Sequence, residues 1–422
     1  MKYKKRIADE ILISRLNAKG AVLVEGAKWC GKTTTASQTS KSILYMQDPA
    51  TKRQNLEMAE INPSLLLKGK TPRLIDEWQL APQLWDAVRF EVDKRNQFNQ
   101  FILTGSAVPA DMDKISHTGT GRISRMKMRP MSLYESEDSN GTVSLKDLFE
   151  QNEIAAENSI DIEKLAFLIC RGGWPKTLDC SDKIALQQSI DYFDAVVESD
   201  ISRVDGVLRN SERAKLIMRS YSRNIGTQAK LTEILKDVIS NESDAFTIET
   251  LHSYLAALKK IFVIEESPAW NPNLRSKTAI RTTETRFFAD PSIATASLGL
   301  GPKDLINDLN TMGLLFENLC IRDLRVYADI LDGTIYHYRD KSDLECDAVL
   351  HRRNGTYGLI EIKLGGDKLI EEGVKNLTAL SKKIDTTKMN TPSFLMILTG
   401  VGPYAYKRKD GIYIVPIGCL YV

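Results

Sequence analysis

The chain has 422 residues, of which 42% are hydrophobic and 27% charged, the proportions of an ordinary soluble protein. This length predicts two or three domains, and no apolar run approaches the ~20 residues that cross a bilayer, so we expect no membrane partner. A formal net charge of +2 does not point to nucleic acid, and six scattered cysteines without C-x-x-C pairs indicate neither a disulfide framework nor a zinc site and favour a reducing cytoplasm.

The first segment of the chain is predicted to form an amphipathic helix. In MKYKKRIADEILISRL, residues 1–16, charges interrupt the apolar positions that a signal peptide would keep contiguous. An apolar run at 21–24, AVLV, then predicts a buried strand. It leads into GAKWCGKT at 26–33, which satisfies the pattern G-x-x-x-x-G-K-[ST], and the residues after it can continue as a helix.

This glycine-rich string predicts a phosphate-binding loop. Its glycines let successive N–H groups face one concavity, toward which the following helix directs its positive end. Lys32 would reach the β- and γ-phosphates of a nucleotide, and Thr33 would ligate Mg²⁺. The alternative is a glycine-rich turn with a solvated lysine. The predicted nucleotide-binding residues of the loop are Gly26, Ala27, Lys28, Trp29, Cys30, Gly31, Lys32, Thr33 and Thr34.

Two further apolar strands are predicted to end at the same site. In RLIDEWQ at 73–79, Asp76 would bind Mg²⁺ through water and Glu77 would polarise the attacking water, although acidic pairs also mark solvated strand ends. QFILTGSAVP at 100–109 ends in Thr104. Because the carboxyl ends of parallel strands converge on the ligand crevice, Thr104 is predicted to sense the γ-phosphate, the alternative being a simple polar strand end.

The next motif, HTGTGRISRMKMRPMSLYE at 117–135, contains a candidate arginine finger. Arg122 would insert at the nucleotide of a neighbouring subunit and stabilise the charge of phosphoryl transfer. The same alternation of polar and apolar residues also describes a plain edge strand with a charged face. Both interpretations stay open at this point.

The chain resembles prokaryotic ATPases of the AAA+ superfamily that carry a carboxyl-terminal domain of unknown function. The strings that carry this resemblance are VLVEGAKWCGKTT, RLIDEWQ, FILTGS, GTGRI, MRPMSLYE and the later GGWP at 172–175. The resemblance spans most of the chain, and its amino-terminal motifs are the more specific ones. It implies an α/β protein of four regions. These are a P-loop AAA+ ATPase core with a parallel sheet at 1–140, a helical lid or linker at 141–225, a winged-helix-like domain at 226–300 and a restriction-endonuclease-like α/β domain at 301–422.

The middle of the chain has helical patterns, broken at a Gly-Gly-Trp-Pro turn in which Trp174 is predicted to be a packing anchor. The next part of the chain is predicted to form a helix (AKLTEILKDVI), a polar turn (SNESDAFT), a second helix (IETLHSYLAALKKIF) and a strand (VIEESPAW). This order suits a winged helix-turn-helix. Few basic residues lie on the second helix. Two hypotheses for this winged-helix-like region therefore stay open, namely contact with DNA and a role as a protein-interaction spacer. Asp290, which precedes a proline, is predicted to cap a helix.

The carboxyl-terminal part has the layout of a divalent-metal nuclease. An amphipathic helix at 313–328 bears Glu317, and strand patterns place Asp347 on one strand and Glu361 with Lys363 on one face of another. The carboxylates would hold Mg²⁺, the lysine would activate water, and Glu317 would orient the metal. The resemblance covers these residues as the PD-(D/E)XK class, although Cys346 stands where that pattern has proline. The alternatives are an exposed salt-bridging face and a fold relic that binds DNA or a partner.

Together these motifs predict a cytoplasmic ATPase that uses ATP and Mg²⁺. Lys32, Thr33, Asp76 and Glu77 would carry its chemistry, and DNA and a second copy of the chain are its candidate macromolecular partners. Two other hypotheses compete with this one. The chain would be an ATP-gated, metal-dependent DNA nuclease, or a nucleotide-responsive scaffold with little turnover that binds DNA or protein.

Overall fold

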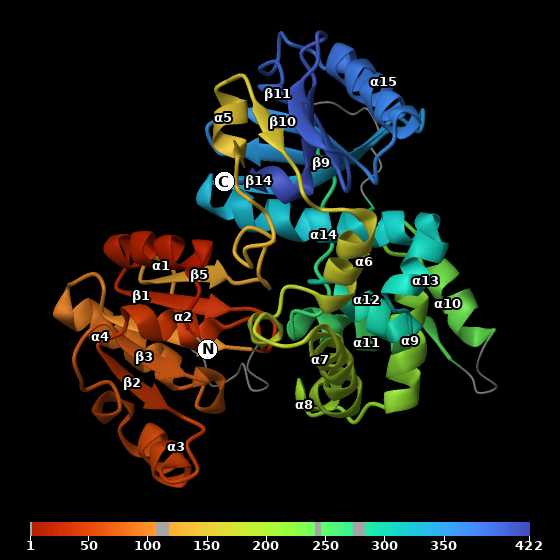
Figure 1. Ribbon diagram of the computed structural model, residues 1–422. Helices are drawn as coiled ribbons and strands as arrows, with labels where there is room; N and C mark the ends of the chain where they lie inside the picture. Colours follow the sequence, from red (N-terminus) through yellow and green to blue (C-terminus); the bar gives the residue numbers. More distant parts are fainter. Residues whose placement is uncertain (1, 107–117, 241–245, 273–282) are drawn as a thin grey trace.

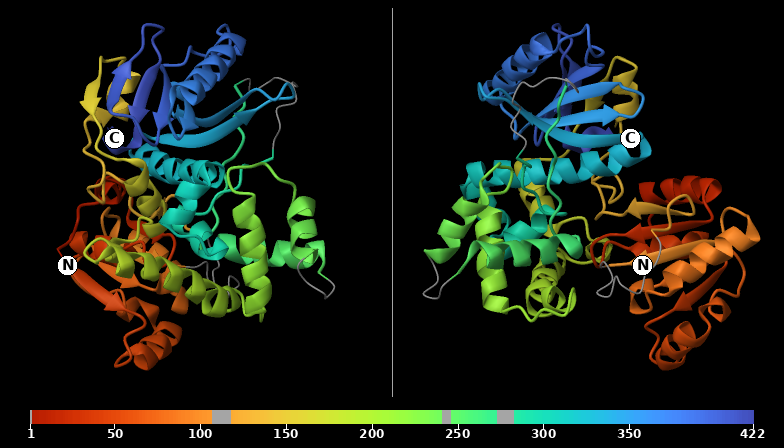
Figure 2. Two further views of the ribbon diagram at one scale, coloured as in Figure 1. Left: turned by 45° about the vertical axis from the view of Figure 1, so that its right-hand side comes forward. Right: turned by 180° about the vertical axis from the view of Figure 1, so that it is seen from behind.

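Three groups of elements make up the molecule, which the computed structural model describes at residues 2–106, 118–240, 246–272 and 283–422. Figure 1 shows a sheet with its helices in the red and orange amino-terminal part, a green helical middle and a second sheet in blue. The long helix α14 (Leu309–Ile330), in cyan, lies between the blue sheet and the other two groups, as Figure 2 also shows from two further sides. No described helix combines the length and the apolar character that a membrane span requires.

The amino-terminal sheet has five parallel strands in the order β2-β3-β4-β1-β5. Its central strands read as continuous apolar runs because both faces of a parallel sheet are covered by helices, and every residue of β4 is buried. The strands are β1 (Ala21–Glu25), β2 (Ser42–Tyr45), β3 (Arg73–Asp76), β4 (Phe101–Gly105) and β5 (Ile123–Lys127). The helices are α1 (Ile7–Ala18), α2 (Lys32–Thr39), α3 (Lys52–Ile61) and α4 (Leu84–Arg95).

The register of this sheet brings three sequence motifs to one edge. Strand β4 lies between β1 and β3, so Thr104 is opposite Val24 on one side and opposite Asp76 on the other. The loop that follows β1 and the acidic residues that end β3 therefore flank the end of β4. This is the carboxyl edge of the sheet, where the ligand crevice of an open parallel sheet forms.

The middle of the chain is helical. Its helices are α6 (Ile162–Arg171), α7 (Asp182–Ala195), α8 (Ile201–Arg203), α9 (Ser211–Arg223), α10 (Leu231–Ile239), α11 (Ile248–Lys260), α12 (Pro291–Leu298) and α13 (Pro302–Asn307). After α11, Ile264 pairs with Phe288 and Ser267 with Thr285 in antiparallel bridges. This order agrees with the elements predicted for a winged helix, whose assignment stays a prediction, and residues 241–245 of its predicted turn lie outside the described residues.

Two predictions for the middle are confirmed. Trp174 is 1% exposed and donates its indole N–H to Ser292 Oγ at 2.9 Å, so it is a packing anchor. Asp290 caps α12, because its Oδ1 accepts the backbone N–H of Ser292 at 3.0 Å. Its other oxygen, Oδ2, accepts the guanidinium of Arg322 from α14 at 2.8 Å. The cap is therefore also a link to the next group of elements.

The second sheet is mixed and has the order β7-β12-β13-β11-β10-β9-β8. Strands β8 (Gly333–Arg339), β9 (Glu345–Arg352) and β10 (Tyr357–Lys363) form an antiparallel meander, and α15 (Asp367–Lys383) crosses from β10 to the parallel strand β11 (Phe394–Thr399). Strands β12 (Tyr404–Lys407) and β13 (Tyr413–Pro416) extend the sheet. The chain order α14, β8, β9, β10, α15, β11 places Asp347 and Glu361 on adjacent strands.

The predicted helical region at 141–225 needs a correction at its start. Residues 143–157 contain β6 (Val143–Ser144), α5 (Leu145–Phe149) and β7 (Ala155–Glu157), and they lie on the carboxyl-terminal part of the molecule. Strand β7 pairs with β12, β6 pairs with β14 (Leu420–Tyr421), and the ring of Phe149 packs edge-on against Phe394. The partners of this segment lie about 250 residues away, and local periodicity carries no signal for such pairings.

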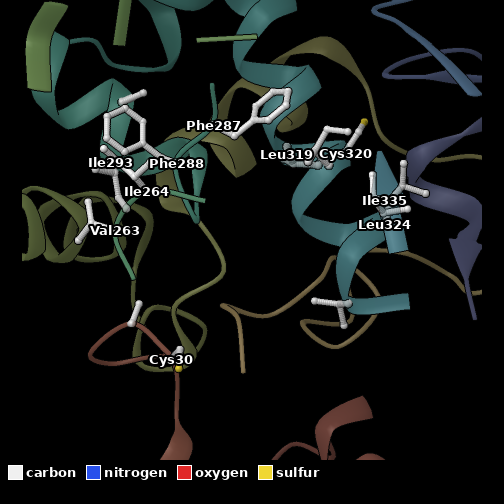
Figure 3. Packing of buried hydrophobic residues seen from close by; sticks show 14 of the residues in the cluster. Cys30, Val263, Ile264, Phe287, Phe288, Ile293, Leu319, Cys320, Leu324 and Ile335 are labelled. Carbon is white, nitrogen blue, oxygen red and sulfur yellow. The ribbon is translucent and has the colours of Figure 1, made fainter. Parts of the chain in front are cut away.

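One continuous cluster of buried apolar residues joins the three groups of elements. Figure 3 shows Cys30 of the first loop near one end of this cluster, with residues of the middle and of α14 beyond it. The labelled members are Cys30, Val263, Ile264, Phe287, Phe288, Ile293, Leu319, Cys320, Leu324 and Ile335. The loop after β1 is thus packed against a core that extends to the second sheet.

An ion-pair network also joins the three groups. Arg129, two residues after β5, pairs with Glu265 of the middle at 2.8 Å and with Asp329 of α14 at 2.6 Å. Lys127 adds a third contact, to Glu265 at 3.1 Å. Burial opposes the ionisation of Glu265, but the neighbouring cations outweigh it and hold its pKa well below the usual value. Glu265 is therefore an ionised side chain that links the amino-terminal part to the middle of the chain.

Candidate nucleotide site

The loop at 26–33 turns sharply between β1 and α2 because its glycines adopt backbone angles that other residues avoid. Gly26 has φ +152° and Gly31 has φ +99°. A Cβ on Gly26 would lie 2.0 Å from the carbonyl oxygen of Met128, so a side chain there would collide with backbone. Gly31 is the N-cap of α2, and the positive end of this helix faces the loop.

Lys32 lies within the curl of the loop. Its side chain is buried, and its ammonium donates to the carbonyl oxygens of Gly26 at 2.9 Å and Ala27 at 2.8 Å. An ammonium makes stronger hydrogen bonds with ionised acceptors such as phosphate than with peptide carbonyls. The position of the Lys32 ammonium within this loop therefore suits binding of the phosphates of a nucleotide.

Asp76 holds the two hydroxyls that the sequence placed on different elements. Its Oδ1 accepts Thr33 Oγ1 at 2.6 Å and Thr104 Oγ1 at 2.7 Å, and the residue is 1% exposed. A carboxylate beside a threonine hydroxyl is an oxygen donor set of the kind that Mg²⁺ takes together with substrate phosphates. These residues therefore fit a nucleotide-bound Mg²⁺. The hydroxyl of Thr104 contacts Asp76, and its predicted contact with a γ-phosphate stays a prediction.

Glu77 follows directly, in a left-handed backbone conformation with φ +56° that few residues other than glycine adopt. Its carboxylate accepts a hydrogen bond from the side-chain amide of Gln79. Burial, and then the charge of Asp76, raise the pKa of Glu77 above its ordinary value. A carboxylate whose pKa is raised toward neutrality is a better proton acceptor, which suits the predicted role of activating water.

A cleft of about 670 Å³ opens beside these residues. This volume is within the range of small-molecule sites, roughly 300–1,000 Å³. Its lining includes Lys32, Thr33 and Glu77, and also side chains that sequence reasoning did not single out. The additional lining residues include Tyr3, Gln47, Ser106, Pro175 and Lys176. Ser106 lies in the quoted string FILTGS and Pro175 in the quoted string GGWP, whereas Tyr3, Gln47 and Lys176 come from segments without a phosphate-binding pattern.

The middle of the chain reaches the loop through two of its side chains. Lys28 Nζ lies 2.5 Å from Asp200 Oδ1, and the ring of Trp29 lies 5.9 Å from that of Tyr192. Tyr192 in turn lies 4.2 Å from Trp174. The side chains of Lys28 and Trp29 therefore contact the middle of the chain, although both also line the cleft.

Arg122 lies at the opposite edge of the sheet from the loop. Its carbonyl oxygen accepts the N–H of Ala21, at the start of β1, whereas the loop follows the end of β1, roughly 15 Å away at about 3.3 Å per residue. Its Nε pairs with Asp93 of α4 at 2.8 Å, and its side chain is 45% exposed. It does not reach the nucleotide site of its own chain, so action at a neighbouring subunit remains the prediction.

The predicted carboxyl-terminal site is partly assembled. Lys363 lies between the two acids, 3.3 Å from Asp347 Oδ2 and 2.6 Å from Glu361 Oε2. Burial lowers the pKa of Lys363, but these two carboxylates outweigh it and raise the value overall. Among the described residues, no three His, Cys, Asp or Glu side chains form a group that could hold a metal ion. The structure therefore brings together a carboxylate, lysine, carboxylate cluster, and the metal remains a prediction.

Glu361, which is buried, and Glu317, which is half-buried, are acids of this cluster with shifted pKa values. Burial, and then the charge of Asp347, raise the pKa of Glu361 to about 8 and the pKa of Glu317 well above its ordinary value. Glu361 has no exposed surface, and neither of its side-chain oxygens makes a hydrogen bond within the described residues, although Lys363 faces one of them as an ion pair. Such an acid is a common feature of functional sites.

Family comparisons agree with this geometry at the amino terminus. Residues 18–137 match a family described as an AAA domain. Residues 162–304 and 312–420 match two families described as domains of unknown function, DUF8612 and DUF4143. The first match and the loop geometry together identify residues 18–137 as a P-loop NTPase domain, and they support ATP binding. The other two divide the remainder into one middle and one carboxyl-terminal region.

Similar proteins include the uncharacterized proteins Mb2031c of Mycobacterium bovis and Rv2008c of Mycobacterium tuberculosis. Each is 23% identical over 369 residues, which cover 86% of this chain and 74% of the relative. Among solved structures, a Walker-type ATPase of Pyrococcus abyssi is 15% identical with a TM-score of 0.43, and covers 68% of this chain and 94% of its own. A RuvB variant of Thermotoga maritima is 16% identical with a TM-score of 0.23, with coverages of 62% and 87%. Scores this low add nothing to the fold assignment.

Proposed function

We propose that this protein binds ATP with Mg²⁺ at the loop of residues 26–33 and hydrolyses it. The observation that carries the proposal is the arrangement around Asp76, whose carboxylate accepts the hydroxyls of Thr33 and Thr104 beside the buried ammonium of Lys32. The AAA domain match supports ATP as the nucleotide. A bound Mg²⁺ would neutralise charge on the phosphates during transfer.

Each residue of the site has a proposed role that follows from its position. The loop N–H groups and Lys32 would bind the β- and γ-phosphates, and the hydroxyl of Thr33 with the carboxylate of Asp76 would hold the metal. Glu77 would take the proton of the attacking water, for which its raised pKa suits it. The turn at 175–179 would cover the cleft from the side of the middle region and exclude water.

Calorimetry with ATP and GTP tests the binding part. We expect Mg²⁺-dependent heat with wild-type protein and its loss in Lys32→Ala. Lys41→Ala is the matched control, because Lys41 is an exposed lysine at the start of β2 and lies outside the cleft. The absence of heat with either nucleotide at millimolar concentration would refute the proposal, and tighter binding of GTP would refute the choice of ATP.

Phosphate release tests the hydrolysis part against the scaffold hypothesis. In Glu77→Gln, hydrolysis should fall by about 10²- to 10⁴-fold while ATP binding persists. A wild-type rate no higher than that of Glu77→Gln, with binding intact in both, would favour a nucleotide-responsive scaffold. The participation of Arg122 is tested by mixing Arg122→Ala with Lys32→Ala, since activity recovers on mixing only if an arginine acts at the site of another subunit.

A metal-dependent DNA nuclease is the second candidate function, favoured by one observation. Glu361 is a fully buried acid whose oxygens make no hydrogen bonds among the described residues, and it lies beside Asp347 and Lys363 on adjacent strands. The oxygen donors suit Mg²⁺, but Lys363 stands between them, so cation binding requires the ammonium to move.

Supercoiled plasmid with Mg²⁺ or Mn²⁺ and ATP tests this second candidate. Cleavage by wild-type protein that disappears in both Lys363→Ala and Glu361→Gln would support it. Lys375→Ala, a lysine on α15 that makes none of the recorded ion pairs of this cluster, is the control. Cleavage that survives Lys363→Ala, or no cleavage at all, would refute it.

A further inference from the structure

Arg6, the residue before α1, is a buried cation that contacts the P-loop from outside the nucleotide-binding motifs. Its side chain is 3% exposed, and its Nε lies 3.0 Å from Oε1 of Glu135, whose side chain is 1% exposed. The Glu135 carboxylate also accepts the backbone N–H of Ile7 at 2.8 Å and of Ser132 at 2.9 Å. The pair is therefore anchored by main-chain groups on both sides.

Two carbonyl oxygens complete the contacts of the guanidinium. Arg6 Nη1 donates to Cys30 O at 2.9 Å, and Nη2 donates to Arg129 O at 2.9 Å. Cys30 belongs to the P-loop, and Arg129 belongs to the segment that follows β5. Because the donors of a guanidinium point in fixed directions within one plane, Arg6 sets the position of one backbone relative to the other.

The contact with Cys30 determines which group the loop presents to the cleft. In a trans peptide the C=O and the following N–H point in opposite directions. Since Cys30 O points toward Arg6, the N–H of Gly31 points away from Arg6. Gly31 begins the turn into Lys32, and both Gly31 and Arg6 are among the residues that line the cleft. If the carbonyl were released and the peptide rotated, an oxygen would face an anion where an N–H now stands.

We infer that Arg6 is a positioning residue for nucleotide phosphates. It holds the Cys30 carbonyl back, so that the Gly31 N–H stays aimed at a di- or triphosphate, and Glu135 holds Arg6 in turn. This inference rests on the proposed binding of ATP at the P-loop. Arg6 acts through the backbone of Cys30, which distinguishes it from Lys32, whose own ammonium would touch the phosphates.

The test compares ATP with AMP by calorimetry in the double variant Arg6→Met, Glu135→Gln. The double change removes both charges, so no unpaired ion is left in the interior. Loss of a hydrogen bond from a charged donor predicts that the ratio of ATP to AMP affinity falls by about tenfold. The matched control is Lys5→Met, Glu10→Gln, a neighbouring ion pair of 2.9 Å whose side chains are 75% and 56% exposed. It should keep the wild-type ratio.

Thermal unfolding of each variant separates positioning from stability. A merely structural role lowers the melting temperature and leaves the affinity ratio of the folded protein unchanged, which would overturn the inference. If the double variant does not fold, Arg6→Lys serves, because it keeps a cation beside Glu135 but loses the planar fork that reaches Cys30 O and Arg129 O. The ratio should then fall by about threefold, and an unchanged ratio there also overturns the inference. Wild-type protein that binds no ATP would instead refute the proposed function.

Discussion

Replacing Thr104 with valine tests whether the hydroxyl that holds Asp76 supports the metal site. Thr104 is 1% exposed, and valine has nearly its shape, so the change removes one hydrogen bond of 2.7 Å and little packing. A hydrogen bond to a charged acceptor contributes about 1.5–3 kcal/mol. At about 1.4 kcal/mol per factor of ten this is roughly 10- to 150-fold. Asp76 keeps its bond from Thr33, so we expect about tenfold, the lower end of that range.

The assay is phosphate release at saturating ATP over a range of Mg²⁺ concentrations. The concentration of Mg²⁺ that gives half the maximal rate should rise by about tenfold in Thr104→Val, while the affinity for nucleotide measured in EDTA stays the same. Thr399→Val is a matched control, because Thr399 is also a buried threonine at the end of a strand but its hydroxyl has no hydrogen-bond partner among the described residues. An unaltered Mg²⁺ dependence, together with weaker binding of metal-free nucleotide, would refute the reasoning and favour a direct contact with phosphate.

Three further outcomes follow from the same contacts. Gly26→Ala should abolish calorimetric ATP binding, because its Cβ would lie 2.0 Å from Met128 O, and Gly313→Ala, where the nearest atom to a Cβ is 3.8 Å away, should bind normally. Glu265→Gln should lower the unfolding free energy in denaturant titration, by less than the about 3–5 kcal/mol of a fully unpaired buried ion, because Arg129 keeps its ion pair with Asp329. The depressed pKa of Glu265 also predicts that its stabilisation is complete above the unfolded value of 4.5 and is lost as the pH falls through the folded value. Acid unfolding curves of wild type and Glu265→Gln should therefore converge at low pH, and parallel curves would contradict this.

Much of the nucleotide site could be predicted from the sequence because its determinants are local. The glycines of the loop, the lysine and the threonine are adjacent in the chain, and Asp76 and Thr104 end apolar runs whose parallel pairing follows from their composition. The hydrogen bonds of both threonines to Asp76 are consistent with that expectation. The pairing of neighbouring parallel strands within this one domain therefore brings Asp76 and Thr104 together.

The remaining features depend on contacts between segments far apart in the chain. Arg6 lies in a basic stretch at the start of a predicted helix. In the structure its side chain is 3% exposed and pairs with Glu135, which is 129 residues away in the chain. Residues 155–157 have too few apolar positions to indicate a strand, and they form one because the edge of β12 offers backbone partners. Arg122 lies at the edge of the sheet where the parallel strands begin, because β5 runs in the same direction as β1. The motif alone does not specify this direction.

The segment after β5 explains how a nucleotide site and a distant helix share one framework. Met128 N–H donates to Glu25 O at 2.7 Å, beside the P-loop. Five residues later, Leu133 N–H donates to the Asp323 carboxylate of α14 at 2.9 Å. Buried hydrogen bonds therefore tie the two ends of this short segment to the P-loop side and to α14, and leaving one of these buried groups unpaired costs about 1–3 kcal/mol. Because α14 also carries Glu317, this segment connects the nucleotide site with the helix that contributes to the carboxyl-terminal cluster.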